Sequence, residues 1–174
     1  MTEPTGARRA HAGQRVLVIL RHAKAEHPAA TADVDRPLTQ RGHADAAAAG
    51  AWLAARGYRP DLVLCSPAKR TRQTWRGVSV ALTGSEDLPV RYEKALYHDG
   101  VGAALDLVRV VPATTRSVLL IGHNPTVSTL SALLDEGTEQ DLRTSGIAVH
   151  AHDGDWTGYG PGTAALIATH TARA

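Results

Sequence analysis

Runs of aliphatic residues recur along the chain, each short and nearly free of polar side chains. Three of them, at 16–20, 61–65 and 117–121, consist mostly of Val, Leu and Ile. Such a run is typical of a strand that is buried on both faces, as in a parallel sheet. Further strands, less uniform in composition, are predicted at 89–92, 146–152 and 163–169.

Stretches with helical periodicity separate these runs. Residues 40–56 carry apolar side chains at the i, i+3, i+4 spacing that lines one face of a helix, and Gly57 follows as a C-terminal stop. Ser66 and Pro67 are predicted to open the next helix, as its N-cap and first helical residue. The expected helices cover 40–56, 67–82, 102–111 and 125–134, the last with Asn124 as N-cap.

Strands and helices therefore alternate over most of the chain. This order predicts the α/β class, as a three-layer α/β/α sandwich with a largely parallel central sheet. No repeat or Pro/Gly-rich linker divides the sequence, so we expect a single domain over 15–174. The polar and basic residues 1–14 are predicted to form a disordered tail.

Composition narrows the functional classes. The chain has 174 residues, a net charge of +2 and only 4% aromatic residues with no Phe, so an aliphatic core is expected. Charges are nearly balanced and no Lys/Arg stripe is interleaved with aromatics, which argues against nucleic-acid binding. Cys65 is the only cysteine, which excludes an internal disulfide and a cysteine-based zinc site. No apolar run is long enough for a signal segment or a membrane span, so a cytoplasmic protein is expected.

Histidines and arginines follow the predicted buried strands. Arg21 and His22 end the first strand, Ser66 and Arg70 follow the second, and His123 follows the third. Ligands of open α/β sheets bind at the carboxyl ends of strands, so these side chains are expected to meet at one edge of the sheet. Two arginines beside two histidines favour a dianion such as phosphate, because the planar guanidinium binds phosphoryl oxygens in pairs. One histidine can then attack phosphorus while the other donates to the equatorial oxygens, without a metal.

Four segments resemble the motifs of the histidine phosphatase superfamily, the group that includes cofactor-dependent phosphoglycerate mutases. They appear in the family's order as Leu-Arg-His-Ala-Lys at 20–24, Arg-Pro-Leu-Thr-Gln-Arg-Gly at 36–42, Leu-Cys-Ser-Pro-Ala-Lys-Arg-Thr-Arg-Gln-Thr at 64–74 and Leu-Ile-Gly-His-Asn-Pro at 120–125. The chain looks most like the small bacterial SixA-type phosphohistidine phosphatases. The resemblance implies a phosphoglycerate mutase-like fold. It also implies His22 as the nucleophile that forms a phosphohistidine intermediate, with Arg21, Arg70 and His123 as the phosphoryl-binding set.

The proton donor is the point at which the chain departs from its larger relatives, which place a Glu or Asp after the second-arginine helix. When this segment is aligned with the larger relatives, His98 falls near the position of their proton donor. Asp99 and Glu93 are neighbouring candidates for the acid. A phosphoramidate tolerates a weak acid better than an ester does, because imidazole leaves well once it is protonated. The stretch between Arg70 and His123 is also short, so no large lid is expected. Both observations favour phosphohistidine on a partner protein as the substrate, with inorganic phosphate as product.

Other interpretations remain open. A phosphomonoesterase or mutase acting on a small phosphate ester would share this chemistry, and a carboxylic acid in the site or a lid would favour it. A non-catalytic phosphate-binding module is the alternative from a different class, and the presence of both histidines argues against it. His150 and His152 share one face of a predicted strand, where a solvated surface is favoured over a metal site because no third ligand is placed. Neither a cofactor nor a metal is therefore predicted.

Overall fold

The structure is a computed structural model that describes residues 9–82, 85–137 and 141–174. Its strands are β1 Arg15–Arg21, β2 Leu62–Cys65, β3 Val90–Tyr92, β4 Ser117–Gly122, β5 Gly146–His152 and β6 Ala165–Thr171. Its helices are α1 Gln40–Arg56, α2 Lys69–Ser79, α3 Ala95–His98, α4 Val101–Arg109 and α5 Thr126–Leu134. Short 3-10 turns occur at Asp33–Asp35, Ser85–Asp87 and Trp156–Gly158.

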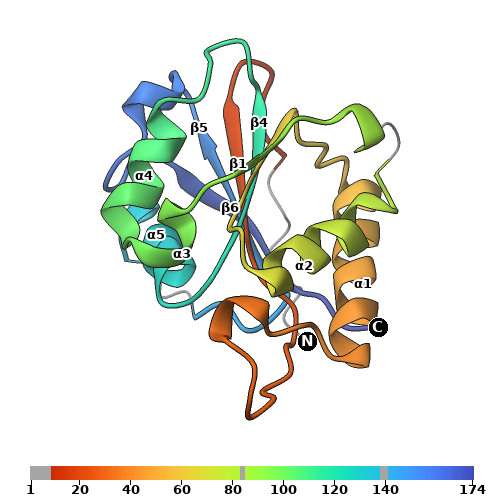
Figure 1. Cartoon of the computed structure of the whole chain (residues 1–174). Coiled ribbons are helices and arrows are strands. Elements are labelled where there is room, and N and C mark those ends of the chain that lie inside the picture. The colour runs from red at the N-terminus through yellow and green to blue at the C-terminus, as the bar shows by residue number, and fades with distance from the viewer. Residues whose placement is uncertain (1–8, 83–84, 138–140) are drawn as a thin grey trace.

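The six strands that lie within the described residues form one sheet in the order β3-β2-β4-β1-β5-β6 (Figure 1). The first four strands in this order run parallel, whereas β5 and β6 are antiparallel to their neighbours. The predicted α/β fold with a largely parallel central sheet is confirmed. Because β1 and β4 are central and parallel, they deliver their carboxyl ends side by side.

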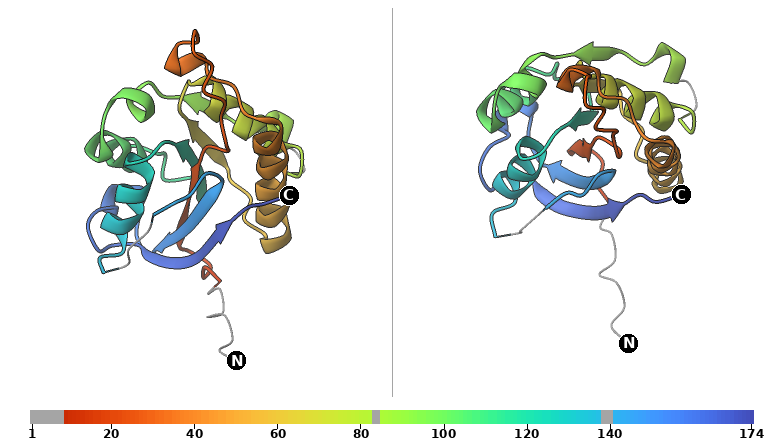
Figure 2. Two further views of the ribbon diagram at one scale, coloured as in Figure 1. Left: turned by 90° about the horizontal axis from the view of Figure 1, so that it is seen from below. Right: turned by 60° about the horizontal axis from the view of Figure 1, so that its bottom comes forward.

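Helices cover both faces of the sheet, with α1 and α2 on one side and α3, α4 and α5 on the other (Figure 2). The side chains of the central strand β1 pack alternately against the two helical layers. Leu17 and Ile19 pack in the cluster under α4 and α5, and Val18 and Leu20 pack in the cluster under α1 and α2. Successive side chains of a strand point to opposite faces, so an unbroken aliphatic run is what a doubly covered strand requires.

Two predicted helix starts are wrong, and each involves a residue expected to cap the helix. The helix α2 begins at Lys69 rather than Pro67, and its N-cap Ala68 makes no side-chain capping hydrogen bond. Likewise α5 begins at Thr126, after Pro125. The side chains of Ser66 and Asn124 also bond to groups distant in sequence: Ser66 Oγ lies 2.7 Å from His123 Nε2, and Asn124 Nδ2 donates to the Leu142 carbonyl. Each side chain thus combines a local bond, from the Ala68 amide to Ser66 and from the Ser128 hydroxyl to Asn124, with a tertiary partner that the local sequence does not predict.

The amino-terminal segment falls partly outside the described residues. Residues 1–8 of the predicted tail are not among them. Between residues 9 and 14, a turn is closed by the Gln14 amide, which donates to the His11 carbonyl, and the Gln14 side chain donates to Asp153. In the parts of the chain that are described, none of the helices combines the length and the apolar character needed to cross a bilayer.

Candidate active site

The carboxyl ends of β1, β2 and β4 lie at one edge of the sheet, the lower edge in Figure 1. His22 follows β1 and His123 follows β4, and their ring centroids are 5.2 Å apart. The guanidinium groups of Arg21 and Arg70 lie near enough to both rings to disfavour a proton on either of them. The structure thus brings together the four residues that the strand-end argument selected.

The ring of His22 is held in one tautomer. Its Nδ1 lies 2.7 Å from the carbonyl oxygen of Ala23, and a carbonyl oxygen only accepts hydrogen bonds. Nδ1 therefore carries the hydrogen, and Nε2 of the neutral ring carries the free lone pair. Thr74 on α2 holds this arrangement, because its Oγ1 accepts from the Ala23 amide at 3.0 Å and donates to the Arg70 carbonyl at 2.7 Å.

Both histidines are held in the neutral form at ordinary pH. Burial lowers the pKa of His22 from 6.5 to about 4; the bond to Ala23 opposes this decrease, and the charges of Arg70 and Arg21 reinforce it. Burial also lowers the pKa of His123 to about 3, with Arg70 and His22 adding to the effect. Only a neutral imidazole has a lone pair, so this environment keeps His22 able to attack without first losing a proton.

His123 is oriented by Ser66, which is fully buried at the end of β2. Ser66 Oγ accepts a bond from the Ala68 amide at 3.4 Å and lies 2.7 Å from His123 Nε2. If the hydroxyl donates to Nε2, the hydrogen of the neutral His123 ring resides on Nδ1. Nδ1 is buried and has no partner among the residues that the structure describes. In that tautomer Nδ1 is a donor without a partner in the described part of the chain, on a ring whose centroid lies 5.2 Å from that of His22.

The two arginines are fixed by backbone carbonyls. Arg21 Nη1 donates to the Leu142 carbonyl at 2.9 Å, and Arg70 Nη1 donates to the Asp33 carbonyl at 2.7 Å. The Nε atoms of both arginines are buried and lack a hydrogen-bond partner within the described part of the chain. Buried N–H groups are nearly always paired in proteins, so donors left free beside two neutral histidines are suited to bind an anion.

Asp33 and Tyr97 border the site, and neither was selected from the sequence. Asp33 lies in the loop between β1 and α1, and its Oδ2 accepts from Tyr97 Oη at 2.6 Å and from Arg70 Nη2 at 3.1 Å. The bond from Tyr97, with those from Arg36 and Arg70, lowers the pKa of Asp33 far below its usual range. Tyr97 in turn meets the His123 ring edge-on, with centroids 5.5 Å apart. Asp33 stands at no motif spacing, so only the folded loop reveals it.

Comparison with known proteins identifies the family. Residues 17–103 match the histidine phosphatase superfamily (branch 1). The chain belongs to this superfamily. An uncharacterised Mycobacterium tuberculosis protein is 40% identical over 88% of this chain and 100% of its own length. The structure of a protein described as a putative phosphohistidine phosphatase SixA, from Nakamurella multipartitia, is 34% identical and covers 92% of this chain and 98% of its own, with a TM-score of 0.79. A structure of the protein histidine phosphatase SixA complexed with tungstate is 28% identical, covers 90% of this chain and 96% of its own, and has a TM-score of 0.77.

These similarities place the chain in the SixA-type branch of the histidine phosphatases, and hence among the phosphatase hydrolases. The contacts within this structure account for motif residues to which the sequence alone assigned no role. The Gln73 side chain accepts from the Leu38 amide at 2.8 Å, and Thr39 caps α1 by accepting from the Gly42 amide. A Cβ atom at Gly42 would collide with the Lys24 carbonyl. These motif residues thus hold the chain that follows His22 against α1 and α2.

The candidate acids of this histidine phosphatase make no hydrogen bond to His22 or His123 in the part of the chain that the structure describes. His98 is exposed, and its ring meets the Tyr97 ring edge-on, with centroids 4.6 Å apart. The side chains of Glu93 and Asp99 make no hydrogen bond or ion pair with any residue that the structure describes. The segment instead presents Tyr97 to the site. The hydrogen bond that Tyr97 donates to Asp33 raises its pKa, which makes it a poor proton donor near neutral pH.

The remaining histidine pair proves different from expectation. The interpretation of His150 and His152 as a solvated strand face is wrong for His150, which is fully buried. His150 lies 2.8 Å from Ser131 Oγ and 2.9 Å from the Ala164 carbonyl, so its two ring nitrogens serve the packing of α5 on the sheet. Among the described residues, no group of three or more His, Cys, Asp or Glu side chains is placed to hold a metal.

Proposed function

We propose that the protein removes phosphate from phosphohistidine on a partner protein, with His22 as nucleophile. The observation that carries this proposal is the bond from His22 Nδ1 to the Ala23 carbonyl, since it leaves the Nε2 lone pair free in a buried, neutral ring. Nε2 forms a bond to phosphorus as the P–N bond of the substrate breaks, and the departing imidazole takes up a proton from solvent water. Water then attacks the phosphohistidine on His22, which releases inorganic phosphate and restores the neutral ring.

The cationic side chains serve the transferred phosphoryl group. Its charge is spread over three equatorial oxygens, so fixed donors around them stabilise the transition state. In the proposed mechanism the buried Nε–H groups of Arg21 and Arg70 and the Nδ1–H of His123 supply these donors. Backbone and side-chain bonds already hold all three residues, so little reorganisation accompanies the reaction. The positive charge comes from arginine, and we propose that no metal takes part.

The proposed substrate class follows from the weakness of the proton donors available in the site. A sugar phosphate leaves as an alkoxide and needs a positioned acid to protonate its oxygen. Asp33, the carboxylate that bonds to Arg70 at the site, is held ionised by its hydrogen bonds from Tyr97 and Arg36 and by Arg70, so it carries no proton to give. A phosphohistidine substrate needs far less help, because its leaving group is an imidazole. The likeness to SixA supports the same substrate. We place the reaction in the cytoplasm.

Two measurements test the proposal. Wild-type protein incubated with a phosphohistidine peptide should release phosphate in the presence of EDTA and acquire an acid-labile label. The variant His22→Asn should lose both, with turnover reduced at least ~10³-fold, the scale of losing a catalytic group. His43→Asn, at an exposed position on α1, is the matched control and should behave as wild type. Near-normal turnover by His22→Asn, or a sugar phosphate hydrolysed more efficiently than the peptide, would contradict the proposal.

A further inference from the structure

A groove runs between α2 and β3, the edge strand of the sheet. Its volume is about 520 Å³, within the range of cavities that receive small ligands or partner side chains. The residues that line it are Pro67, Arg72, Trp75, Arg76, Ser79 and Tyr92. None of them belongs to the group that surrounds His22 and His123, so the groove is a separate surface feature.

One end of the groove, at Pro67, is next in the chain to a residue of the candidate active site. Pro67 directly follows Ser66, whose Oγ lies 2.7 Å from His123 Nε2. Arg72 and Arg76 are four residues apart on α2 and therefore share one side of the helix, whereas Arg70 is buried at the site. One helix thus contributes a guanidinium to the site and two more to the groove beside it. A macromolecule that presents a phosphoryl group to His22 can also cover this groove.

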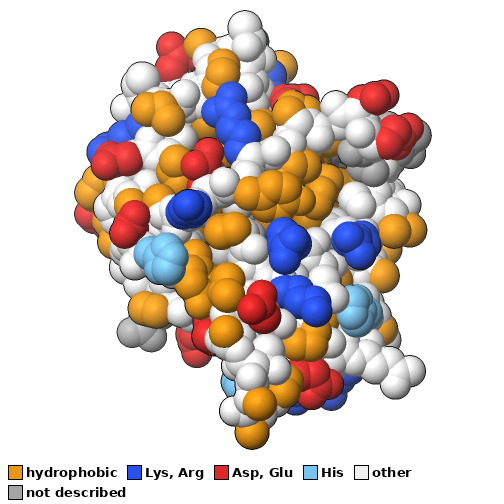
Figure 3. Space-filling view, in the orientation of Figure 1, with side chains coloured by type: hydrophobic (Ala, Val, Ile, Leu, Met, Phe, Trp, Pro, Cys, Tyr) orange, Lys and Arg blue, Asp and Glu red, His pale blue; other side chains and the backbone are white. Residues whose placement is uncertain are grey.

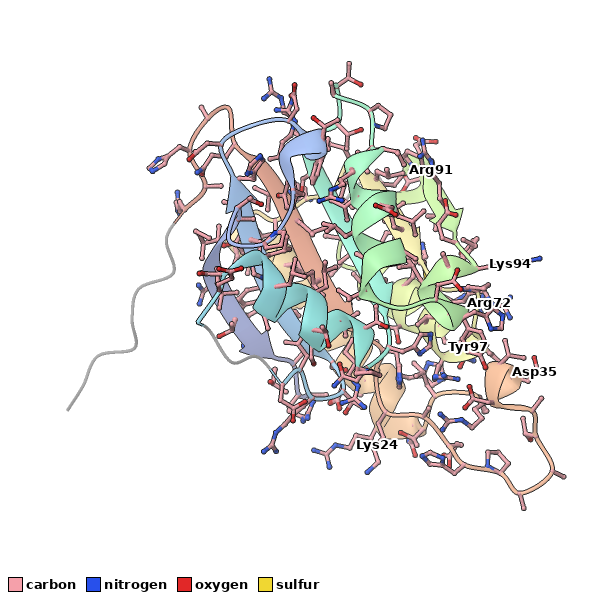
Figure 4. All side chains as sticks on the ribbon, turned by 90° about the vertical axis from the view of Figure 1, so that its left-hand side faces the viewer. Lys24, Asp35, Arg72, Arg91, Lys94 and Tyr97 are labelled. Carbon is pink, nitrogen blue, oxygen red and sulfur yellow. The ribbon has the colours of Figure 1, made fainter. Side chains whose placement is uncertain are left out.

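The groove carries positive charge that is not neutralised within the described residues. Arg72 and Arg76 are exposed, and neither guanidinium makes an ion pair or hydrogen bond there. Burial raises the pKa of Tyr92, and the charges of Arg72 and Arg76 lie close enough to its hydroxyl to oppose that rise. Figure 4 shows Arg72 on the same side of the molecule as Arg91, Lys94 and Tyr97. The chain's charges are nearly balanced overall, so this unpaired cluster is a local property.

Apolar surface accompanies the charge. Tyr92 is 49% exposed, which is unusual for a large hydrophobic side chain in this protein, and Trp75 forms the floor with 7% of its surface exposed. On the face drawn in Figure 3, hydrophobic side chains gather above α2 and Lys and Arg side chains border them. Aromatic rings flanked by arginines are the composition that protein interfaces favour.

We propose that this groove is the docking surface for the phosphohistidine-bearing partner, and that it binds an acidic segment of that partner which carries an apolar side chain. The inference rests on the proposed function and adds to it the chemistry that selects the partner. The carboxylates pair with Arg72 and Arg76, and the apolar side chain lies against Trp75 and Tyr92. Binding there raises the local concentration of the phosphoryl group at His22 without contributing to the chemical step.

Matched substrates and matched charge reversals test the docking surface. The probes are phosphoramidate, which is too small to reach the groove, and phosphohistidine peptides flanked by Glu-Leu-Glu or by Gln-Leu-Gln at several spacings. Wild-type protein should cleave the best acidic peptide with kcat/KM at least ~10-fold above its neutral counterpart, and the preference should shrink at about 0.5 M salt because screening weakens exposed charge pairs. The double variant Arg72→Glu/Arg76→Glu should abolish the preference through KM. Its turnover of phosphoramidate should stay within ~2-fold of wild type, since rim charges affect association rather than chemistry.

A second double variant, Arg59→Glu/Arg116→Glu, carries the same charge change at the opposite end of the sheet, before β2 and β4. It should keep the preference for the acidic peptide. The docking surface would be overturned if both double variants lost the preference for the acidic peptide to the same extent, or if the wild type showed no such preference at any spacing. Either result would leave the proposed function intact. Tyr92→Ala should raise KM for both peptides, which share the leucine, and should leave turnover of phosphoramidate unchanged. An unchanged KM would remove the apolar part of the proposal. A wild-type protein inactive on phosphoramidate and on every peptide would overturn the proposed function and the docking surface together.

Discussion

Acidification from about pH 7 to about pH 5 should destabilise the folded protein through His22, by about 2 kcal/mol. The folded pKa of this histidine is about 4, against 6.5 for the free side chain, and the ring is 8% exposed. Between these two pKa values, His22 is protonated in the unfolded chain and neutral in the folded protein. Its contribution to the free energy of unfolding is therefore fully present above the unfolded pKa and is lost as the pH falls toward 4. Each pKa unit of difference between the folded and unfolded states is worth about 1.4 kcal/mol of stability. The difference between 6.5 and about 4 therefore limits the total loss of stability to about 3 kcal/mol.

The perturbation is His22→Asn, which removes the titrating ring. Its amide nitrogen is a donor that can replace Nδ1 at the Ala23 carbonyl. Urea unfolding of wild type and variant, followed by the fluorescence of the buried Trp75 and Trp156, gives the free energy of unfolding at each pH. The variant should lose about 2 kcal/mol less than wild type between about pH 7 and about pH 5. His43→Asn, at an exposed position, should leave the wild-type slope unchanged.

The two proteins are compared by how steeply the free energy of unfolding changes with pH. A change in stability that is the same at every pH therefore cancels. His123 acts in the same direction, because burial lowers its pKa to about 3, but its partial exposure reduces the effect, and this contribution stays in the variant. Inorganic phosphate or tungstate should flatten the wild-type slope, since an anion among the arginines restores the affinity of His22 for a proton. A variant whose slope equals that of wild type would refute the assignment of a buried, neutral nucleophile.

Further substitutions test the supports of the site. Ser66→Ala should lower kcat about 10-fold with little change in KM, because His123 loses the hydroxyl that orients it. Thr74→Val should destabilise the fold by about 1–3 kcal/mol in urea unfolding and lower kcat, because the Ala23 amide loses a buried acceptor. Arg70→Lys should reduce kcat/KM about 10²-fold and weaken tungstate inhibition, since an ammonium does not reproduce the guanidinium fork. Glu93→Ala and Asp99→Ala should each cost less than ~10-fold in kcat/KM on a phosphohistidine peptide, and a larger loss would identify a carboxylic acid as proton donor.

The sequence by itself determined the layers of the fold and the place where chemistry is expected. Unbroken aliphatic runs such as 16–20 can satisfy only a strand covered on both faces, and Leu17 and Val18 duly face opposite layers. Parallel strands put their carboxyl ends at one edge, so Arg21, His22 and His123 were expected to meet there before any contact was known. These conclusions depend on periodicity and chain order, which are local properties that a sequence displays directly.

Tertiary structure decided how those residues are held. The tautomer of His22 depends on the Ala23 carbonyl, and the position of that peptide depends on Thr74, fifty-one residues further along the chain. Asp33 reaches Arg70 from a loop without regular spacing, so no pattern in the sequence predicts the contact. Ser66 was expected to be the N-cap of a helix, but that helix begins later, at Lys69, and the Ser66 hydroxyl also orients His123. A side chain able to bond locally takes a distant partner when burial removes water as the alternative, and only the folded chain specifies which partner lies within reach.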